Sequence, residues 1–294
     1  MTQVFYFKRG NFPQKVEEIM EDKKAKVKNI RKSRLLVFVF VVLTMSLQTG
    51  CAYLTEQQHF HLTTPTPLND DQTLVIGFLG GRQRWDDDSR GVRQLAVKLD
   101  EMSLPKVEIE TFQNRRRDLA MEFIHKALDR NEDDNLGSQE RASARLILYG
   151  QSLGGSTVVK LSKDLEKLDI PVLLTVQVDS VGFNDHLIPS NVLKAANLFQ
   201  SNDWIFRGEN EILALDPEAT SILANIEFDY SNKEVDMTAQ PWQRRLFSTP
   251  HSMMDADPEV WAIVEELILD ELGDHKENFL VEDDHLKTDH PFKG

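Results

Sequence analysis

The sequence predicts an α/β protein with a mostly parallel central sheet and helices on both faces of that sheet. Short apolar runs that suit single buried strands occur at residues 74–78, 146–149 and 172–178. Segments with apolar residues at helical spacing lie between these runs. Because parallel strands need a crossover connection, this alternation of strands and helices favours a parallel sheet.

The first half of the folded body is expected to alternate strands and helices. A strand at 73–78 precedes a helix whose start is expected in the acidic segment 86–89, since carboxylates suit a helix N-terminus. The next strand is expected at 107–112, where apolar and charged residues alternate. A helix at 115–128 then leads toward the strand at the centre of the chain.

The second half follows the same alternation with a looser middle. The apolar spacing of residues 158–168 predicts a helix. Residues 191–198 are expected to form a short helix leading into a strand, and 222–228 a further strand. The last helix is expected to start at Pro258 and to end at Gly273, because proline suits a first turn and glycine suits a helix end.

A G-x-S-x-G motif with Ser152 at its centre lies between a predicted strand and a predicted helix. This context makes the motif a nucleophile elbow, in which the serine hydroxyl stands exposed at a helix N-terminus. Small residues are needed on both sides, because the turn is so sharp that larger side chains would collide with the strand or the helix. Gly150 and Gly154 meet this need, so we expect Ser152 to be a nucleophile.

On these residues, the chain from about Leu74 to Leu272 resembles the lipase and esterase group of α/β-hydrolases. The elbow is the most specific shared motif, and the further features described below occur in the order typical of that group. The resemblance implies an α/β-hydrolase fold and a catalytic triad in the chain order serine, acid, histidine. It does not single out a subfamily.

Asp179 is the acid that this order implies. It ends the predicted strand at 172–178, and open α/β sheets place their chemistry at the carboxyl ends of strands. In most members of the family the acid follows the next strand, whereas some lipases use this one, so Asp203 is the alternative. His251 stands on an expected loop before the final helix, where the fold places its general base.

Two backbone N–H groups are expected to form an oxyanion hole. In this fold one donor is the residue after the nucleophile, here Leu153, and the other comes from the loop after the first strand. Leu79 and Gly80 both fit that second place. Such donors matter because they bind the tetrahedral oxyanion more strongly than the ground-state carbonyl.

Residues 129–140 resemble the twelve-residue calcium loop of EF-hand proteins. Oxygen ligands occupy loop positions 1, 3, 5, 7 and 12, and these are Asp129, Asn131, Asp133, the Asn135 carbonyl and Glu140. Two residues depart from the pattern, since Asp134 occupies the position of the usual glycine and Gly137 occupies position 9. The loop is expected either to hold a structural Ca²⁺ or to be an acidic surface loop without metal. Catalysis itself is expected to need no cofactor.

The N-terminal segment predicts a secretory signal. A basic block at 23–34 precedes the apolar run 35–43, which is too short for a comfortable membrane span. Cys51 follows Gly50 in a pattern that resembles a bacterial lipobox, although Gln48 departs from it. This resemblance implies lipidation of Cys51 and a place in the bacterial cell envelope, facing outside the cytoplasm. An uncleaved signal anchor and a buried free cysteine in a soluble protein are the alternatives.

The charge balance excludes some partners. The chain has a net charge of -14; residues 1–50 contain 10 Lys or Arg and 4 Asp or Glu, so the rest contains 24 and 44, a net charge of -20. So acidic a body argues against nucleic acid and against electrostatic docking on anionic lipid. The expected organisation is a signal and lipobox segment (1–51), a tether (52–72), an α/β-hydrolase domain (73–273) and a disordered acidic tail (274–294).

These residues favour a serine hydrolase that cleaves a carboxylic ester, in a small molecule or a lipid, through an acyl-enzyme on Ser152. Two hypotheses from other functional classes remain. One is a non-catalytic hydrolase-fold lipoprotein that binds a lipid or protein partner at the cell surface, and the other is a structural lipoprotein. The ordered set of Ser152, Asp179 and His251 favours the enzyme over both.

Overall fold

The computed structural model of the chain describes residues 56–203, 207–246 and 248–286. Its centre is a six-stranded sheet in which every neighbouring pair is parallel. Across the sheet the strands follow the order β2 (Val107–Gln113), β1 (Thr73–Leu79), β3 (Leu146–Gln151), β4 (Val172–Val178), β6 (Val192–Gln200) and β8 (Ser221–Phe228). This sheet confirms the predicted α/β class. A second, short parallel pair joins β5 (Leu187–Ile188) to β7 (Leu213–Ala214).

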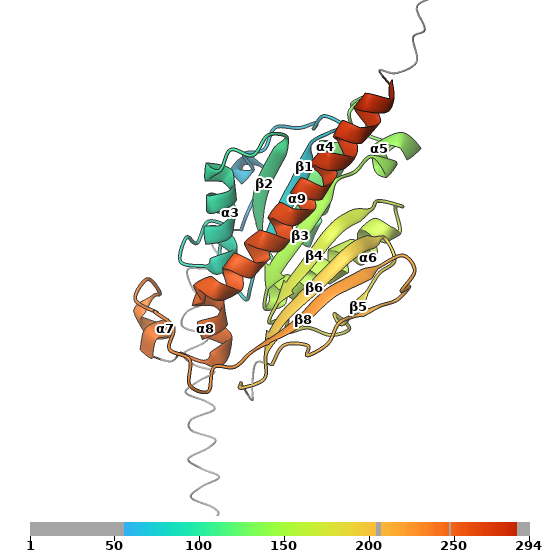
Figure 1. Cartoon of the computed structure of the whole chain (residues 1–294). Helices are drawn as coiled ribbons and strands as arrows, with labels where there is room; N and C mark the ends of the chain where they lie inside the picture. The colour runs from blue at the N-terminus through green and yellow to red at the C-terminus, as the bar shows by residue number, and fades with distance from the viewer. Residues whose placement is uncertain (1–55, 204–206, 247, 287–294) are drawn as a thin grey trace, which may run out of the picture. The chain divides into compact units, whose positions relative to one another are not determined.

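Helices cover both faces of the large sheet (Figure 1). One face carries α3 (Gly91–Glu101) and α9 (Pro258–Leu286), and the other carries α4 (Arg117–Leu128) and α6 (Leu153–Glu166). The shorter helical segments of the described chain are η1 (His59–His61), α5 (Ser138–Ala142), α7 (Trp242–Leu246) and α8 (Pro250–Ala256).

Side chains of the central strands alternate between two apolar layers. In β1, Leu74, Ile76 and Phe78 belong to the layer with α4 and α6, whereas Val75 and Leu79 belong to the layer with α3 and α9. All five side chains are fully buried. A strand buried on both faces has a continuous apolar sequence, which explains the short runs that predict this sheet. Each such burial stabilises the fold by roughly 1.5–3 kcal/mol.

The strand order reverses between β1 and β3. From β1 the chain first forms β2 on one side of β1. It then returns to form β3 on the other side of β1 and continues in that direction through β4 and β6 to β8. Open α/β sheets bind their ligands at the carboxyl ends of the strands where the order reverses. Gly80 follows β1 and Ser152 follows β3, so this topology brings the two residues to the same point of the sheet.

Residues 56–72 do not form the expected tether. Gln57 is fully buried, its Nε2 donates to the Thr111 carbonyl over 2.8 Å, and its backbone N–H donates to Oε1 of Gln113 over 3.3 Å. Leu68 joins the apolar core. The polar composition of this segment indicates a solvated linker, but its polar groups pair with the edge strand β2, whose outer backbone groups need partners.

Two segments of the second half also differ from the expectation. Residues 192–200 form strand β6 and not a short helix, because pairing between β4 and β8 overrides a weak local preference. At the other end, α9 continues through Gly273 to Leu286, so residues 274–286 are helical where a disordered tail is expected. A single glycine inside a helix costs only about 1 kcal/mol, and no proline follows it within α9.

The start of α3 is a smaller difference. The helix begins at Gly91 and not in the acidic segment 86–89. Asp87 ties that segment into a separate turn, since its Oδ1 accepts from the backbone N–H of Ser89 over 3.2 Å and from the Ser89 hydroxyl over 2.6 Å. An aspartate that bonds its own following backbone in this way favours a turn over a helix.

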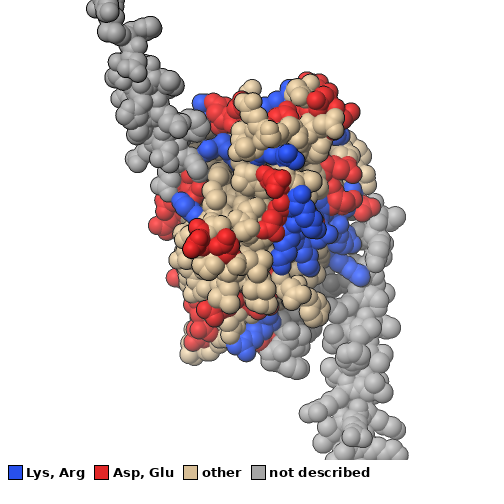
Figure 2. Space-filling model, turned by 90° about the vertical axis from the view of Figure 1, so that its right-hand side faces the viewer, with Lys and Arg blue, Asp and Glu red and all other residues tan. Residues whose placement is uncertain are grey.

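The predicted signal segment 1–51, with its apolar run and Cys51, lies outside the described residues. Within the described ranges, no helix combines the length and the apolarity needed to cross a bilayer. Charge is spread unevenly over the surface. On the face drawn in Figure 2, Lys and Arg side chains gather in a patch among acidic and uncharged residues.

Candidate active site

Ser152 stands on a sharp turn between β3 and α6. Its backbone has φ 59 and ψ -125, a region that costs a non-glycine residue on the order of 1–3 kcal/mol. The glycines on either side permit this turn, because a Cβ on Gly150 would lie 2.6 Å from the carbonyl carbon of Gly154, and one on Gly154 would lie 2.0 Å from the carbonyl oxygen of Phe78. The strained turn expected of a nucleophile elbow is therefore present.

Three side chains from distant parts of the chain form one hydrogen-bonded line. Oγ of Ser152 lies 2.9 Å from Nε2 of His251, and Nδ1 of the same ring lies 2.5 Å from Oδ2 of Asp179. In sequence, His251 is 99 residues from Ser152 and 72 from Asp179. This is the arrangement that activates a serine hydroxyl, with a base on the serine and an acid that orients the base.

Asp179 is held firmly for the orienting position. Its side chain is fully buried, Oδ1 accepts from the backbone N–H of Gly208 over 3.0 Å, and Oδ2 accepts from Nε2 of Gln200 over 3.0 Å. A buried carboxylate needs such donors, because an unpaired charge in the interior is costly. These hydrogen bonds fix the orientation of the carboxyl group and leave Oδ2 directed at His251.

The alternative acid, Asp203, does not occupy this position in the structure. It follows β6, and its backbone N–H donates to Oε1 of Gln200 over 2.8 Å. Gln200 in turn donates from Nε2 to Oδ2 of Asp179. Asp203 therefore supports the residue that faces His251, while Asp179 itself makes the contact with the ring.

His251 lies in the first turn of a helix, not on the expected loop. Thr249 caps α8, since its side chain accepts from the backbone N–H of Ser252, and Pro250 occupies the first helical position. The sequence S-T-P-H contains this helix start, which a search for the final helix alone overlooks. A helical backbone holds the imidazole more rigidly than a loop would.

A buried cluster of charges anchors α8. Asp255, whose side chain is fully buried, accepts from Nη1 of Arg244, lies 3.5 Å from Nη1 of Arg90 and accepts from the backbone N–H of Gly91 over 3.3 Å. Burial lowers the pKa of the Arg244 guanidinium, although the Asp255 carboxylate opposes the shift. The cluster joins α8 to the start of α3 and so fixes the element that carries His251.

The two loops expected to supply an oxyanion hole meet at Ser152. A Cβ on Gly80 would lie 2.9 Å from Cβ of Ser152, so the backbone of Gly80 abuts the nucleophile. Leu153 is the first residue of α6, where backbone N–H groups have no partner within the helix. Leu79 is the last residue of β1, and its carbonyl accepts from Nδ2 of Asn114 over 2.9 Å. Of the two candidates after β1, Gly80 is the one in contact with Ser152.

The N–H of Gly80 has an acceptor in this structure. It donates to Oε1 of Gln83 over 3.1 Å, so a side-chain oxygen takes the place in which a developing oxyanion could be bound. Gln83 is only partly buried, which leaves its side chain free to move aside. Of the N–H groups expected to bind an oxyanion, that of Gly80 is therefore already paired in this structure.

Models of known protein families do not match this chain, and no characterised protein matches it significantly. The chemical interpretation of Ser152, His251 and Asp179 therefore rests on their geometry.

Gln151 is a residue of the site that the sequence interpretation missed. Its Nε2 lies 3.4 Å from Nε2 of His251, and a Cβ on Gly80 would lie 2.6 Å from its Oε1. The amide thus fills the space between the base and the loop after β1. Its position immediately before Ser152 in the motif is the signal that could have found it.

The acidic loop is closed by its own hydrogen bonds. Oδ2 of Asp129 accepts from the backbone N–H of Asp134 over 2.9 Å, and Oδ1 of Asp133 accepts from that of Asn135 over 2.8 Å. Asp134 adopts the positive φ of 62 that the calcium loop requires at this position. In the described part of the chain, no three His, Cys, Asp or Glu side chains are grouped closely enough to hold a metal ion.

Glu140, the expected last ligand of that loop, also bonds to backbone. Its carboxylate accepts from the N–H groups of Gly137 and Arg130 over 2.8 and 2.9 Å, and these bonds, with that of Gly137 the strongest, lower its pKa. Cys51, the expected lipidation site, lies outside the described residues.

Proposed function

We propose that this chain is a serine hydrolase of the α/β-hydrolase fold that cleaves a carboxylic ester. The observation that carries the proposal is the continuous line of hydrogen bonds from Asp179 through His251 to Ser152. Its placement on a strained turn at the switch point of a parallel sheet adds support, because nucleophile elbows have this context.

The geometry supports an acyl-enzyme mechanism. His251 Nε2 takes the proton of Ser152 as Oγ attacks the ester carbonyl, and Asp179 holds the ring with Nδ1 protonated. The N–H groups of Leu153 and Gly80 bind the oxyanion, with the carbonyl oxygen replacing Oε1 of Gln83 on Gly80. His251 then gives its proton to the leaving alcohol, and water releases the acyl group by the same steps in reverse.

The location belongs to the same proposal. A lipid on Cys51 would hold the enzyme on a membrane of the bacterial cell envelope, with its substrate a small ester or a lipid. The segment 56–72, which packs along β2, would then follow directly from the anchored N-terminus.

Labelling with a fluorophosphonate probe tests the nucleophile. The wild-type chain should be labelled and should hydrolyse p-nitrophenyl butyrate, whereas Ser152→Ala should do neither. Ser162→Ala is the matched control, because this buried serine of α6 donates to the Val158 carbonyl over 2.9 Å and does not contact His251. Equal labelling of the wild type and Ser152→Ala would refute the proposed nucleophile.

A further inference from the structure

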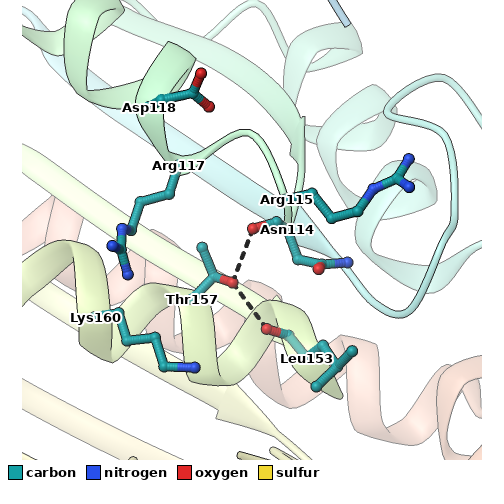
Figure 3. Close-up of a pocket in the computed structure, with 7 residues that line it drawn as sticks. All are labelled: Asn114, Arg115, Arg117, Asp118, Leu153, Thr157 and Lys160. Atoms are coloured by element: carbon teal, nitrogen blue, oxygen red, sulfur yellow. Dashed lines mark hydrogen bonds between the residues drawn. The ribbon is translucent and has the colours of Figure 1, made fainter. Parts of the chain in front are cut away.

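A cavity of about 380 Å³ opens beside the proposed oxyanion hole. Its walls are the β2–α4 loop with the start of α4 on one side and the first two turns of α6 on the other (Figure 3). Leu153, which lines this cavity, also directly follows Ser152 in the chain. The residue that would bind the oxyanion therefore belongs to the cavity wall.

Hydrogen bonds fix the cavity wall to the catalytic loops. Oγ1 of Thr157 donates to the carbonyls of Asn114 and Leu153 over 3.2 and 2.9 Å, as Figure 3 shows. Nδ2 of Asn114 donates to the carbonyls of Leu79 and Gly81, on the loop that carries the second oxyanion donor. A ligand in this cavity would thus be positioned relative to Ser152 through backbone contacts.

The cavity is lined by cations. Arg115, Arg117 and Lys160 contribute to its wall, and the Lys160 ammonium points toward Leu153 (Figure 3). Nε of Arg117 lies 3.2 Å from Asp164, so its charge is partly balanced. Among the described residues, neither Arg115 nor Lys160 has a carboxylate partner within ion-pair distance, although the chain as a whole is strongly acidic.

The one carboxylate in the wall does not cancel these charges. Asp118 points away from Lys160 in Figure 3, and its Oδ1 lies 3.1 Å from Nε of Arg116, which pairs with it. Arg115 and Lys160 are both exposed and both line the cavity, and cations that line one cavity raise the local concentration of anions. The charge of the cavity wall thus favours an anion, at a place next to the proposed nucleophile.

We propose that the substrate is an ester carrying an anionic phosphate or carboxylate group, which Arg115 and Lys160 bind while the ester carbonyl lies over Ser152. This inference rests on the proposed function and names the substrate class. Arginine presents several N–H donors to such oxygens and lysine adds a point charge, so each contributes a charge-assisted hydrogen bond.

The test compares pairs of similar esters, one neutral and one carrying an anionic group. One pair places the anion on the acyl side, p-nitrophenyl butyrate against mono-p-nitrophenyl succinate, and the other on the alcohol side, 1-butyrylglycerol against 1-butyrylglycerol 3-phosphate. In the double variant Arg115→Gln/Lys160→Gln, kcat/KM for the anionic member of at least one pair should fall about tenfold or more, which corresponds to about 1.4 kcal/mol. The neutral members should be unchanged.

A surface lysine elsewhere on the protein provides the control. Lys126→Gln removes one positive charge from the exposed last turn of α4, outside the cavity, and should leave both pairs unchanged. An equal fall for neutral and anionic esters in the double variant, or no fall in either pair, overturns the inference. Added salt should lower the wild-type kcat/KM for the anionic ester relative to that for the neutral ester, since screening weakens the interactions of exposed charges.

A binding measurement separates this inference from the proposed function. In the Ser152→Ala chain, inorganic phosphate or succinate should raise the melting temperature above that in chloride of equal ionic strength, and Arg115→Gln/Lys160→Gln should abolish the rise. Co-flotation with phosphatidylglycerol but not phosphatidylcholine vesicles, lost in the same variant, would identify a lipid headgroup as the source of the anion. If neither the soluble anions nor the vesicles bind in a manner that the double variant removes, the inference is wrong, whether or not Ser152 is the nucleophile.

Discussion

Oδ2 of Asp179 lies 2.5 Å from Nδ1 of His251, although 72 residues separate them in the chain. Asp179 follows the central strand β4, and His251 lies on α8. A buried charge cluster attaches α8 to α3. Which carboxylate faces the imidazole is therefore decided by how α8 packs.

Asp179→Asn should reduce kcat by on the order of 10⁴, because an amide no longer selects the ring form with Nδ1 protonated. Asp203→Asn should stay within a few-fold of the wild type, because the contact that Asp203 makes with Gln200 uses its backbone N–H. Steady-state kinetics with p-nitrophenyl butyrate compare the two. A nearly inactive Asp203→Asn beside an active Asp179→Asn would reverse the assignment of the acid.

Gly80→Ala should lower kcat by about 10²-fold or more, the effect expected when one oxyanion donor is displaced. The new Cβ would lie 2.6 Å from Oε1 of Gln151 and 2.9 Å from Cβ of Ser152, so the loop must shift away from the nucleophile. Gly81→Ala is the control, since no atom lies within 4 Å of the added Cβ. Its positive φ of 50 should cost stability, while kcat below the melting temperature stays close to that of the wild type.

Asp255→Asn should destabilise the fold by about 3 kcal/mol, because it leaves Arg244 and Arg90 beside a neutral buried side chain. For a domain of this size, the melting temperature should fall by roughly 6–12 °C. Calorimetry measures the loss. Adding Arg244→Met to Asp255→Asn should restore part of the stability. If the double variant instead loses as much stability as the two single variants together, the result would argue against the charge cluster.

Glu140→Gln should lower the melting temperature at neutral pH. The hydrogen bonds from Gly137 and Arg130 lower the Glu140 pKa, so the ionised form stabilises the folded state above the unfolded pKa, and this stabilisation is lost as the pH falls through the folded pKa. The melting temperatures of the variant and the wild type should therefore converge in acid. A constant difference between neutral and acidic pH would show that the carboxylate charge is not responsible.

The calcium hypothesis has a separate measurement. If the acidic loop binds Ca²⁺, a hundredfold excess over Kd should stabilise the wild type by about 2.7 kcal/mol relative to chelator. Glu140→Gln should abolish this difference. Identical melting curves of the wild type in calcium and in chelator would identify residues 129–140 as a metal-free acidic loop.

Cys51→Ser should prevent lipidation and release the protein from the membrane fraction or leave it unprocessed. Wild-type mass spectra should show a mature chain that begins at a lipidated Cys51. An intact chain with an unmodified cysteine would contradict the proposed anchor.

Much of the site could be predicted from the sequence because its signals are local. The turn at Ser152 requires glycines two residues away on each side, and the apolar run before it marks a buried parallel strand. The place of His251 before the final helix predicts its role as the base. These features depend on neighbours in the chain, and for the same reason the sequence determined the α/β class and the elbow.

The tertiary structure decided which distant groups meet. It placed Asp179 and not Asp203 against His251, paired the N–H of Gly80 with Gln83, and set the Arg115 and Lys160 side chains around one cavity beside Leu153. It also attached residues 56–72 to β2 and carried α9 past Gly273. Each of these outcomes depends on packing between elements or on the choice between nearly equal local conformations, and hydrophobic periodicity reports only which side of a single element is buried.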